Sequence, residues 1–310
     1  MRRWLTDDEG RLRITWRLLV FGALVIVLQT AVVLPAVAIF GPQLLQDGGL
    51  GITSPGLVVT QGLGIIAMTL AVFIARRWLD RRSFASLGLQ LRSHWLQHLL
   101  WGMVLGIGLQ AFIFLTELAA GWLVIEDVGW RGTNSAPFGL LLFALVFAAV
   151  AWNEELLTRG YLLQNLESGL GTIAAVTISS LLFGLLHIFN ANASIIATLG
   201  VAFAGLLLAA AYLVTRSLWL PIGLHLGWNY GEGPIFGFPV SGLDAGGLVT
   251  HRVTGPELIT GGAFGPEAGL ISVAAEIVGI ALLGIYFRRS RNRSTAEGTE
   301  QKDFRTLKPT

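Results

Sequence analysis

The sequence predicts an all-α, polytopic membrane protein with about eight transmembrane helices. Of the 310 residues, 54% are hydrophobic and only 13% are charged, and the mean hydropathy is +0.68. About a quarter of the residues of a soluble domain are charged. The chain also contains several apolar runs of about 20 residues, the length that a membrane-spanning helix needs. We therefore expect a lipid bilayer to surround most of the chain.

Eight segments are expected to be helices. Five are nearly uninterrupted apolar runs: Thr15–Phe40, Leu57–Ala75, Leu99–Ile125, Ile195–Val214 and Leu270–Phe287. Three are apolar with polar interruptions: Phe138 to about Leu166, Thr172 to about Phe189, and Leu218 to about Tyr230. The first run is too long for a signal-peptide core and lacks a convincing cleavage site, so we expect it to stay in the mature protein.

The basic residues predict which loops face the cytoplasm, because cytoplasmic loops of membrane proteins collect Lys and Arg. With eight spans, most of the 21 basic residues fall on one side, and both termini are expected there. The expected organisation is a cytoplasmic N-terminus (1–14), three helices (15–136), a core (137–230), an external Gly-rich loop with the last helix (231–289) and a disordered cytoplasmic tail (290–310). The Gly-rich loop is long enough to form a lid or cap.

The composition also excludes several classes of site. The absence of cysteine excludes disulfide scaffolds, thiolate zinc sites and cysteine nucleophiles. The net charge of +2 is too small to indicate a nucleic-acid partner. A metal site would have to use His, carboxylate or amide ligands.

Polar side chains inside apolar helices are costly and usually functional. Glu155 and Arg159 are four residues apart, so they lie on one helical face and are predicted to form an ion pair. Glu154 lies one residue round the helix, where it is free to accept a proton. The same trio also fits a plain charge cluster where a helix leaves the membrane.

Two later helices carry further polar residues at one-turn spacing. Phe183 is followed by His187 in an apolar stretch, and His225 is followed by Asn229. Each pair places its two side chains on one helical face. Taken singly, each pair also fits a structural hydrogen bond between neighbouring helices.

The three patterns together, Glu-Glu-x-x-x-Arg, Phe-x-x-x-His and His-x-x-x-Asn in that order, resemble the motifs of the CAAX protease and bacteriocin-processing (CPBP) family. These are intramembrane endopeptidases related to the type II CAAX prenyl endopeptidase. The resemblance covers about Phe138 to Tyr230, so that the core 137–230 would be a CPBP-type protease core with its site among the fourth, fifth and seventh helices. The segment GPELITGGAFGPEAGL also looks like part of some bacterial members, or is plain turn chemistry.

The resemblance implies a peptidase whose substrate is a peptide or a membrane protein. It makes Glu154 the general base, with His187 holding the attacking water and with His225 and Asn229 stabilising the oxyanion. Three residues are expected to support them: Glu155, Arg159 and Phe183. No cofactor is expected. Zinc is the alternative, because Glu154, His187 and His225 form a ligand set known from catalytic zinc sites, whereas an amide such as Asn229 is a poor zinc ligand.

Depth in the bundle gives a further prediction. A helix that ended at Arg159 would leave Glu154 too far from His187 to share a water molecule. We therefore expect the helix to continue through Leu166, to turn at Gly169 and Gly171, and to bury Arg159.

Glu117 and Glu276 also lie in apolar runs, and we expect both at the membrane interface. They suggest the main alternative function, a proton-coupled transporter. A third alternative is a non-catalytic binding or immunity protein that has kept the protease motifs.

Overall fold

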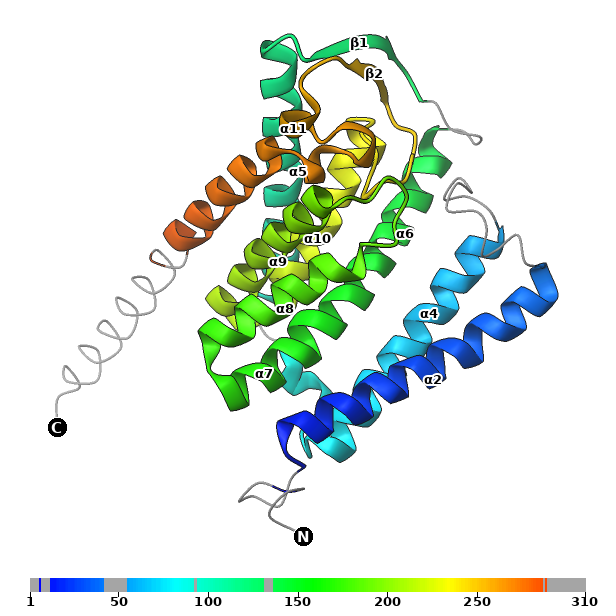
Figure 1. Ribbon diagram of the computed structural model, residues 1–310, viewed down its shortest axis with the longest axis vertical. Coiled ribbons are helices and arrows are strands. Elements are labelled where there is room, and N and C mark those ends of the chain that lie inside the picture. The colour runs from blue at the N-terminus through cyan, green and yellow to red at the C-terminus, as the bar shows by residue number, and fades with distance from the viewer. Residues whose placement is uncertain are drawn as a thin grey trace, which may run out of the picture.

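The computed structural model describes residues 6, 12–41, 55–91, 94–130, 136–286 and 288. Most of them are helical (Figure 1). The labelled helices are α2 (Ile14–Phe40), α4 (Pro55–Ile74), α5 (Trp95–Ala119), α6 (Ala136–Glu155), α7 (Leu163–Leu170), α8 (Thr172–Leu186), α9 (Ile195–Thr215), α10 (Trp219–Tyr230) and α11 (Glu257–Thr260). The chain then continues into an unlabelled helix, Leu270–Tyr286.

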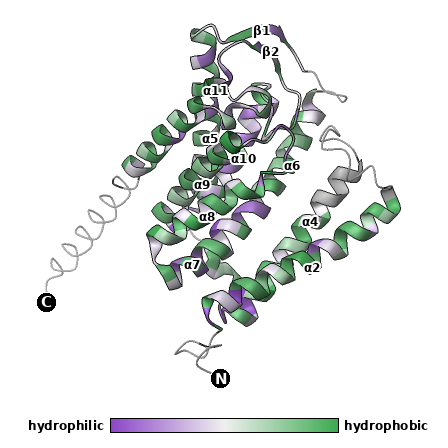
Figure 2. Ribbon diagram, viewed as in Figure 1, coloured by the Kyte–Doolittle hydropathy of each residue, from purple (hydrophilic) through white to green (hydrophobic). Residues whose placement is uncertain are grey.

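Five helical stretches are long and apolar enough to cross a membrane: Ile14–Ile39, Gly62–Leu79, Trp95–Ala119, Ala136–Leu170 and Ile195–Thr215. Two shorter apolar helices are Thr172–Leu186 and Leu270–Tyr286. Each of the eight expected segments overlaps a helix, and apolar residues cover most helical surfaces (Figure 2). The chain is thus an integral membrane protein. Eight crossings and cytoplasmic termini stay predictions, and the tail 290–310 lies outside the described residues.

One long helix carries the first motif, as expected. The stretch Ala136–Leu170 runs through α6, a π-helical turn (Leu156–Leu162) and α7 without a break. It ends at Gly171, whose φ of 80° allows the sharp turn into α8. Arg159 is 1% exposed, which confirms its predicted burial.

Glycines bring α5 and α10 into backbone contact. A Cβ on Gly106 of α5 would lie 2.4 Å from the carbonyl oxygen of Leu224, and a Cβ on Gly227 of α10 would lie 2.2 Å from that of Met103. Only the missing side chains permit this approach, which is typical of packed membrane helices. The contact fixes the position of α10, which carries His225 and Asn229.

The expectation of an all-α chain is wrong at one place. The helix expected to reach Ile125 ends at Ala119, and the strand β1 (Leu123–Val128) follows. It pairs antiparallel with β2 (Val249–Val253) of the Gly-rich segment. This two-stranded sheet lies at the end of the bundle opposite to α7 (Figure 1). The physical reason is a partner strand far away in the sequence, which satisfies the backbone groups that a helix would otherwise pair.

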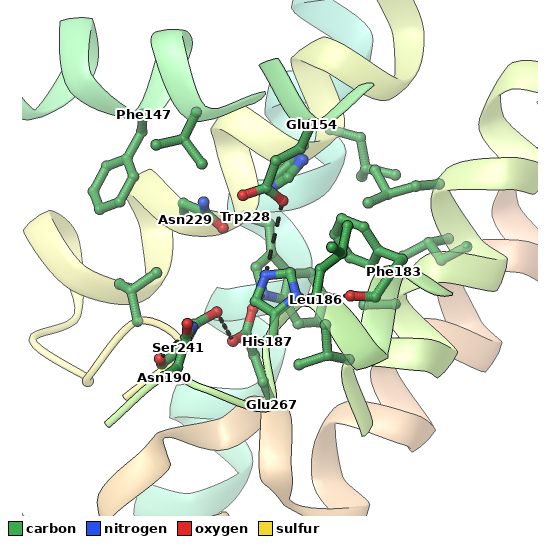
Figure 3. A pocket seen from close by; sticks show the side chains of 18 of the residues that line it. Phe147, Glu154, Phe183, Leu186, His187, Asn190, Trp228, Asn229, Ser241 and Glu267 are labelled. Atoms are coloured by element: carbon green, nitrogen blue, oxygen red, sulfur yellow. Dashed lines mark hydrogen bonds and ion pairs between the residues drawn. The ribbon is translucent and has the colours of Figure 1, made fainter. Parts of the chain in front are cut away.

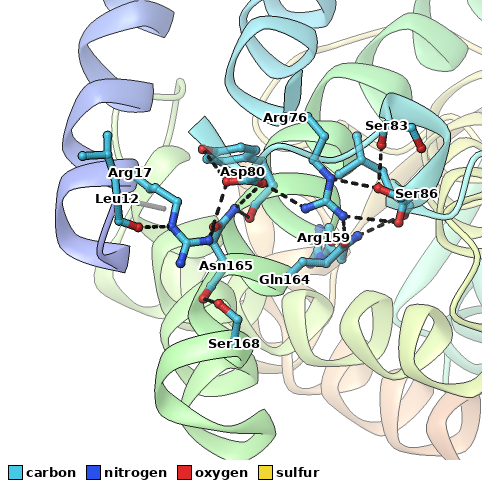
Figure 4. A network of polar contacts seen from close by, with 12 residues as sticks. Leu12, Arg17, Arg76, Asp80, Ser83, Ser86, Arg159, Gln164, Asn165 and Ser168 are labelled. Atoms are coloured by element: carbon cyan, nitrogen blue, oxygen red, sulfur yellow. Dashed lines mark hydrogen bonds and ion pairs between the residues drawn. The ribbon is translucent and has the colours of Figure 1, made fainter. Parts of the chain in front are cut away.

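A buried polar network joins α2 to the helix of the first motif (Figure 4). Asp80 accepts hydrogen bonds from Arg76 (2.9 Å), Asn165 (3.2 Å) and the Tyr161 hydroxyl (3.3 Å). Arg17 of α2 donates to the Asn165 side-chain oxygen at 3.0 Å and lies 3.7 Å from Asp80. Because these groups are buried, each needs its partners. The network therefore holds the α2–α4 pair against the π-helical turn and α7.

Candidate active site

A cavity of about 290 Å³ opens among α6, α8, α9 and α10 (Figure 3). The four predicted catalytic residues line it: Glu154, His187, His225 and Asn229. The structure thus brings together residues that lie 75 positions apart in the sequence. The rest of the lining is mostly apolar, as is usual for a ligand site.

Two imidazoles approach the Glu154 carboxylate from different helices. Glu154 Oε2 lies 3.8 Å from Nε2 of His187 and 3.8 Å from Nε2 of His225. These distances are too long for direct hydrogen bonds. Glu154 Oε2 is buried and has no hydrogen-bond partner among the described residues. A water molecule between the three atoms would satisfy them all.

The other nitrogen of each imidazole is already engaged. Nδ1 of His187 lies 2.8 Å from the carbonyl oxygen of Phe183, one helical turn earlier. A carbonyl oxygen can only accept, so this contact requires the hydrogen of His187 on Nδ1. Nδ1 of His225 lies 3.0 Å from Glu155 Oε1 and donates to that carboxylate. Both histidines therefore present Nε2 to Glu154.

Glu155 lies at the centre of a fully buried ion-pair cluster. Its Oε1 accepts from Arg159 Nη1 at 2.7 Å as well as from His225. Arg159 also donates from Nη2 to the carbonyl oxygen of Gly205 in α9, at 2.9 Å. Glu155 and Arg159 have side-chain exposures of 0% and 1%, so their charges compensate each other away from water. The predicted ion pair is present.

Phe183 links the first motif to the two histidines. The Arg159 guanidinium lies 4.4 Å from the centroid of the Phe183 ring, a cation–π contact. The same ring meets His187 edge-to-face at 4.9 Å and His225 at 6.0 Å. Phe183 therefore sets the spacing between the imidazoles. The predicted supporting residues Glu155, Arg159 and Phe183 thus contact one another or the two histidines of the cavity.

Among the lining residues that sequence analysis missed, four have polar atoms in their side chains: Asn190, Trp228, Ser241 and Glu267. Figure 3 draws Ser241, Asn190 and Glu267 at the end of the cavity away from Glu154. Only Glu267 carried a signal, since it belongs to the GPEAGL sequence that was ambiguous between a family feature and a turn. Ser241 lies 12 residues beyond Asn229, and no pattern in the sequence indicates that it lines the same cavity.

Glu117 and Glu276, which are expected at the membrane interface, are both fully buried, because neighbouring segments of the protein cover them. Their depth in the membrane stays a prediction. Neither lines the cavity, and neither carboxylate has a hydrogen-bond partner among the described residues. The same part of the chain contains no group of three His, Asp or Glu side chains spaced to hold a metal ion.

One known family matches the part of the chain that contains the cavity residues of the three motifs. Residues 135–231 match the family of type II CAAX prenyl endopeptidase Rce1-like proteins. The match includes α6 to α10 and confirms the resemblance that the three motifs indicated. No curated protein and no solved structure matches the chain. The Rce1-like match supports a CAAX-type intramembrane protease in general.

Proposed function

We propose that the protein is an intramembrane endopeptidase that hydrolyses peptide bonds with a water molecule activated by Glu154. The observation that carries the proposal is the convergence of Glu154 Oε2 with Nε2 of His187 and Nε2 of His225, each 3.8 Å away, in the wall of one cavity. Peptide hydrolysis needs a water molecule, a base for it and donors for the oxyanion. These residues can hold the water molecule and supply both the base and the donors.

The histidine hydrogens suggest how the water would be held. His187 carries its hydrogen on Nδ1, so its Nε2 accepts a hydrogen bond from the water. Glu154 Oε2 accepts from the second hydrogen. A lone pair of the water oxygen is then free to attack the carbonyl carbon of the substrate. Attack transfers one proton from the water to Glu154 and puts a negative charge on the former carbonyl oxygen.

His225 and Asn229 would stabilise that oxyanion. With Nδ1 donating to Glu155, His225 can donate through Nε2 only as an imidazolium. The set of Glu154, Glu155, Arg159 and protonated His225 would then be electrically neutral. Asn229 adds an amide donor. Collapse of the intermediate breaks the C–N bond, Glu154 returns its proton to the leaving nitrogen, and a carboxylic acid and an amine result.

The test is cleavage of a mixed peptide and membrane-protein library by the purified protein in detergent, read by mass spectrometry of new chain ends. We expect Glu154→Gln to lose about 10²- to 10⁴-fold in rate, the contribution of a general base. Glu117→Gln is the matched control, because Glu117 is another glutamate of an apolar helix but does not line the cavity. Activity that survives in Glu154→Gln would refute the mechanism.

The same assay separates the alternatives. Loss of cleavage on chelation with recovery on zinc addition would make Glu154, His187 and His225 zinc ligands. We expect cleavage to survive chelation, with no cofactor. A proton-coupled transporter would instead cut nothing, and would depend on Glu117 and Glu276 as much as on Glu154. A non-catalytic immunity protein would cut nothing and bind its partner equally well after Glu154→Gln.

A further inference from the structure

A second carboxylate lines the catalytic cavity away from Glu154 (Figure 3). Glu267 is 5% exposed, and both of its oxygens accept hydrogen bonds from neutral donors. Trp228 Nε1 donates to Oε1 at 3.2 Å, and Ser241 Oγ donates to Oε2 at 2.5 Å. No ion pair involves Glu267 in the described part of the chain. A carboxylate in such a place favours a positively charged neighbour.

The position of Glu267 is rigid. It lies in a single helical turn, Pro266–Ala268, that follows Gly265 with a φ of 107°. Gly200 of α9 touches this turn so closely that a Cβ on it would lie 1.9 Å from the backbone oxygen of Glu267. The carboxylate is therefore presented to the cavity by a fixed backbone. A preformed group of this kind binds a ligand without an ordering cost.

Two further carboxyl groups, those of Glu232 and Glu276, belong to the same cluster as Glu267. Burial, with the nearby Glu267 and Glu276 carboxylates, raises the pKa of the Glu232 carboxyl well above its usual range. Neither oxygen of Glu276 has a hydrogen-bond partner among the described residues. Glu267 is the member of the three with a donor for each oxygen and with contact to the cavity. It is thus the one placed to meet a cation in the cavity.

We propose that Glu267, with Ser241 and Trp228, forms an acidic subsite that binds a lysine or arginine side chain of the substrate beside the scissile bond. This inference rests on the proposed function and adds a substrate class to it. The cationic head would meet Glu267 at one end of the cavity, while the scissile carbonyl group meets Glu154 at the other. The apolar wall between them suits the methylene stem of a lysine.

A purely structural role is the competing explanation. Glu267 could serve only to hold Trp228 and Ser241 in place. Replacement of Glu267 would then change the cleavage of all substrates equally. An acidic subsite instead gives a change that depends on the charge of one substrate residue, and this difference decides between the two.

The experiment uses the full-length protein and a cleaved peptide in which each position around the cut is occupied in turn by Lys, Gln or Glu. We expect one position at which Lys raises kcat/KM over Gln by about 10-fold or more, the effect of a close, desolvated charge pair. Glu267→Gln should lower kcat/KM of the Lys peptide about 10-fold more than that of the Gln peptide. The control Glu117→Gln should keep the preference for Lys.

Two results would overturn the subsite. One is a wild-type protein without preference for Lys at any position, and the other is a Glu267→Gln variant that affects the Lys and Gln peptides equally. If Glu267→Gln does not fold, the subsite is tested instead by inhibition of the wild-type protein with small amphiphiles. Pentylammonium should then inhibit competitively where pentanol does not, and equal inhibition by both would refute the proposal.

Failure of the proposed function would look different. A wild-type protein that cuts no peptide in the series would contradict the endopeptidase proposal. The subsite is then tested by binding alone, with the Lys and Gln peptides titrated against Glu154→Gln. Tighter binding of the Lys peptide would support the acidic subsite, and equal binding would refute it.

Discussion

Glu155 and His225, 70 residues apart in the sequence, are joined by a hydrogen bond of 3.0 Å between their buried side chains. Glu155 is therefore shared between Arg159 of its own helix and the imidazole of α10. Glu154, its sequence neighbour, is instead directed into the cavity. Of the two adjacent carboxylates, Glu155 is thus bound by Arg159 and His225, whereas Glu154 faces the cavity. The first two predictions concern the Glu155 cluster.

Glu155→Gln should destabilise the protein by about 3–5 kcal/mol, because it leaves the buried Arg159 charge without its anion. The measurement is thermal unfolding in detergent. Glu167→Gln is the matched control, since Glu167 pairs with Arg216, whose side chain is 54% exposed. That surface pair should contribute at most about 1 kcal/mol. Equal losses in the two variants would show that the Glu155 cluster is not the stronger one.

Arg159→Lys should lower peptidase activity although it keeps the positive charge. The guanidinium binds Glu155 and the Gly205 carbonyl oxygen with different nitrogens and lies over the Phe183 ring. A lysine ammonium cannot make this planar, two-pronged contact. We expect a fall in kcat of about 10-fold or more with the protein still folded. A variant with wild-type kcat would mean that charge alone is sufficient.

Gly106→Ala should separate α5 from α10, because its Cβ would lie 2.4 Å from the Leu224 carbonyl oxygen. The expected loss of stability is about 1–3 kcal/mol, typical of overpacking, together with loss of activity as His225 moves. Gly108→Ala in the same helix is the control, since its Cβ meets nothing within 4 Å. It should be neutral or stabilising by about 0.5–1 kcal/mol. Thermal unfolding and peptide cleavage of both variants measure the difference.

His251 of β2 should make stability depend on pH. Its ring packs 4.6 Å from that of Phe238, and burial lowers the pKa of its imidazole below 6.5. The unfolded chain then binds the proton more readily, so the stability is full above pH 6.5 and falls as the pH drops below that value, by at most about 1.4 kcal/mol per unit. His251→Phe should remove this part of the pH dependence in unfolding measurements. A pH profile unchanged by the substitution would contradict the assignment.

The helices could be predicted from the sequence because each apolar run is a local signal. The continuation of one helix from Ala136 to Leu170 followed from the first motif and the second together, because a helix that ended at Arg159 would leave Glu154 too far from His187 to share a water molecule. The β1–β2 pair could not be predicted in this way. Leu123–Val128 looks like the end of an apolar helix, and the strand that pairs with it begins only at Val249.

The site residues likewise comprise some that local spacing predicts and some that only a long-range contact brings to the cavity. Glu154, Glu155 and Arg159 are close in sequence, and one-turn spacing predicted both the ion pair and the separate position of Glu154. Glu267 reaches the cavity only because α9 packs against the turn that carries it, a contact made over 67 positions to Gly200. Such a contact has no periodic pattern in a single sequence, so GPEAGL could not be told from an ordinary turn.

The length of the helix Ala136–Leu170 has one further consequence. At about 1.5 Å per residue it measures about 52 Å, with Glu154 about 27 Å from one end and about 24 Å from the other. Both ends of this helix therefore lie far from the Glu154 carboxylate, so water for the proposed reaction would have to reach it through the cavity. Each hydrolysis consumes one water molecule, so turnover depends on how fast the cavity refills, and its rate should fall when osmolytes lower the activity of water.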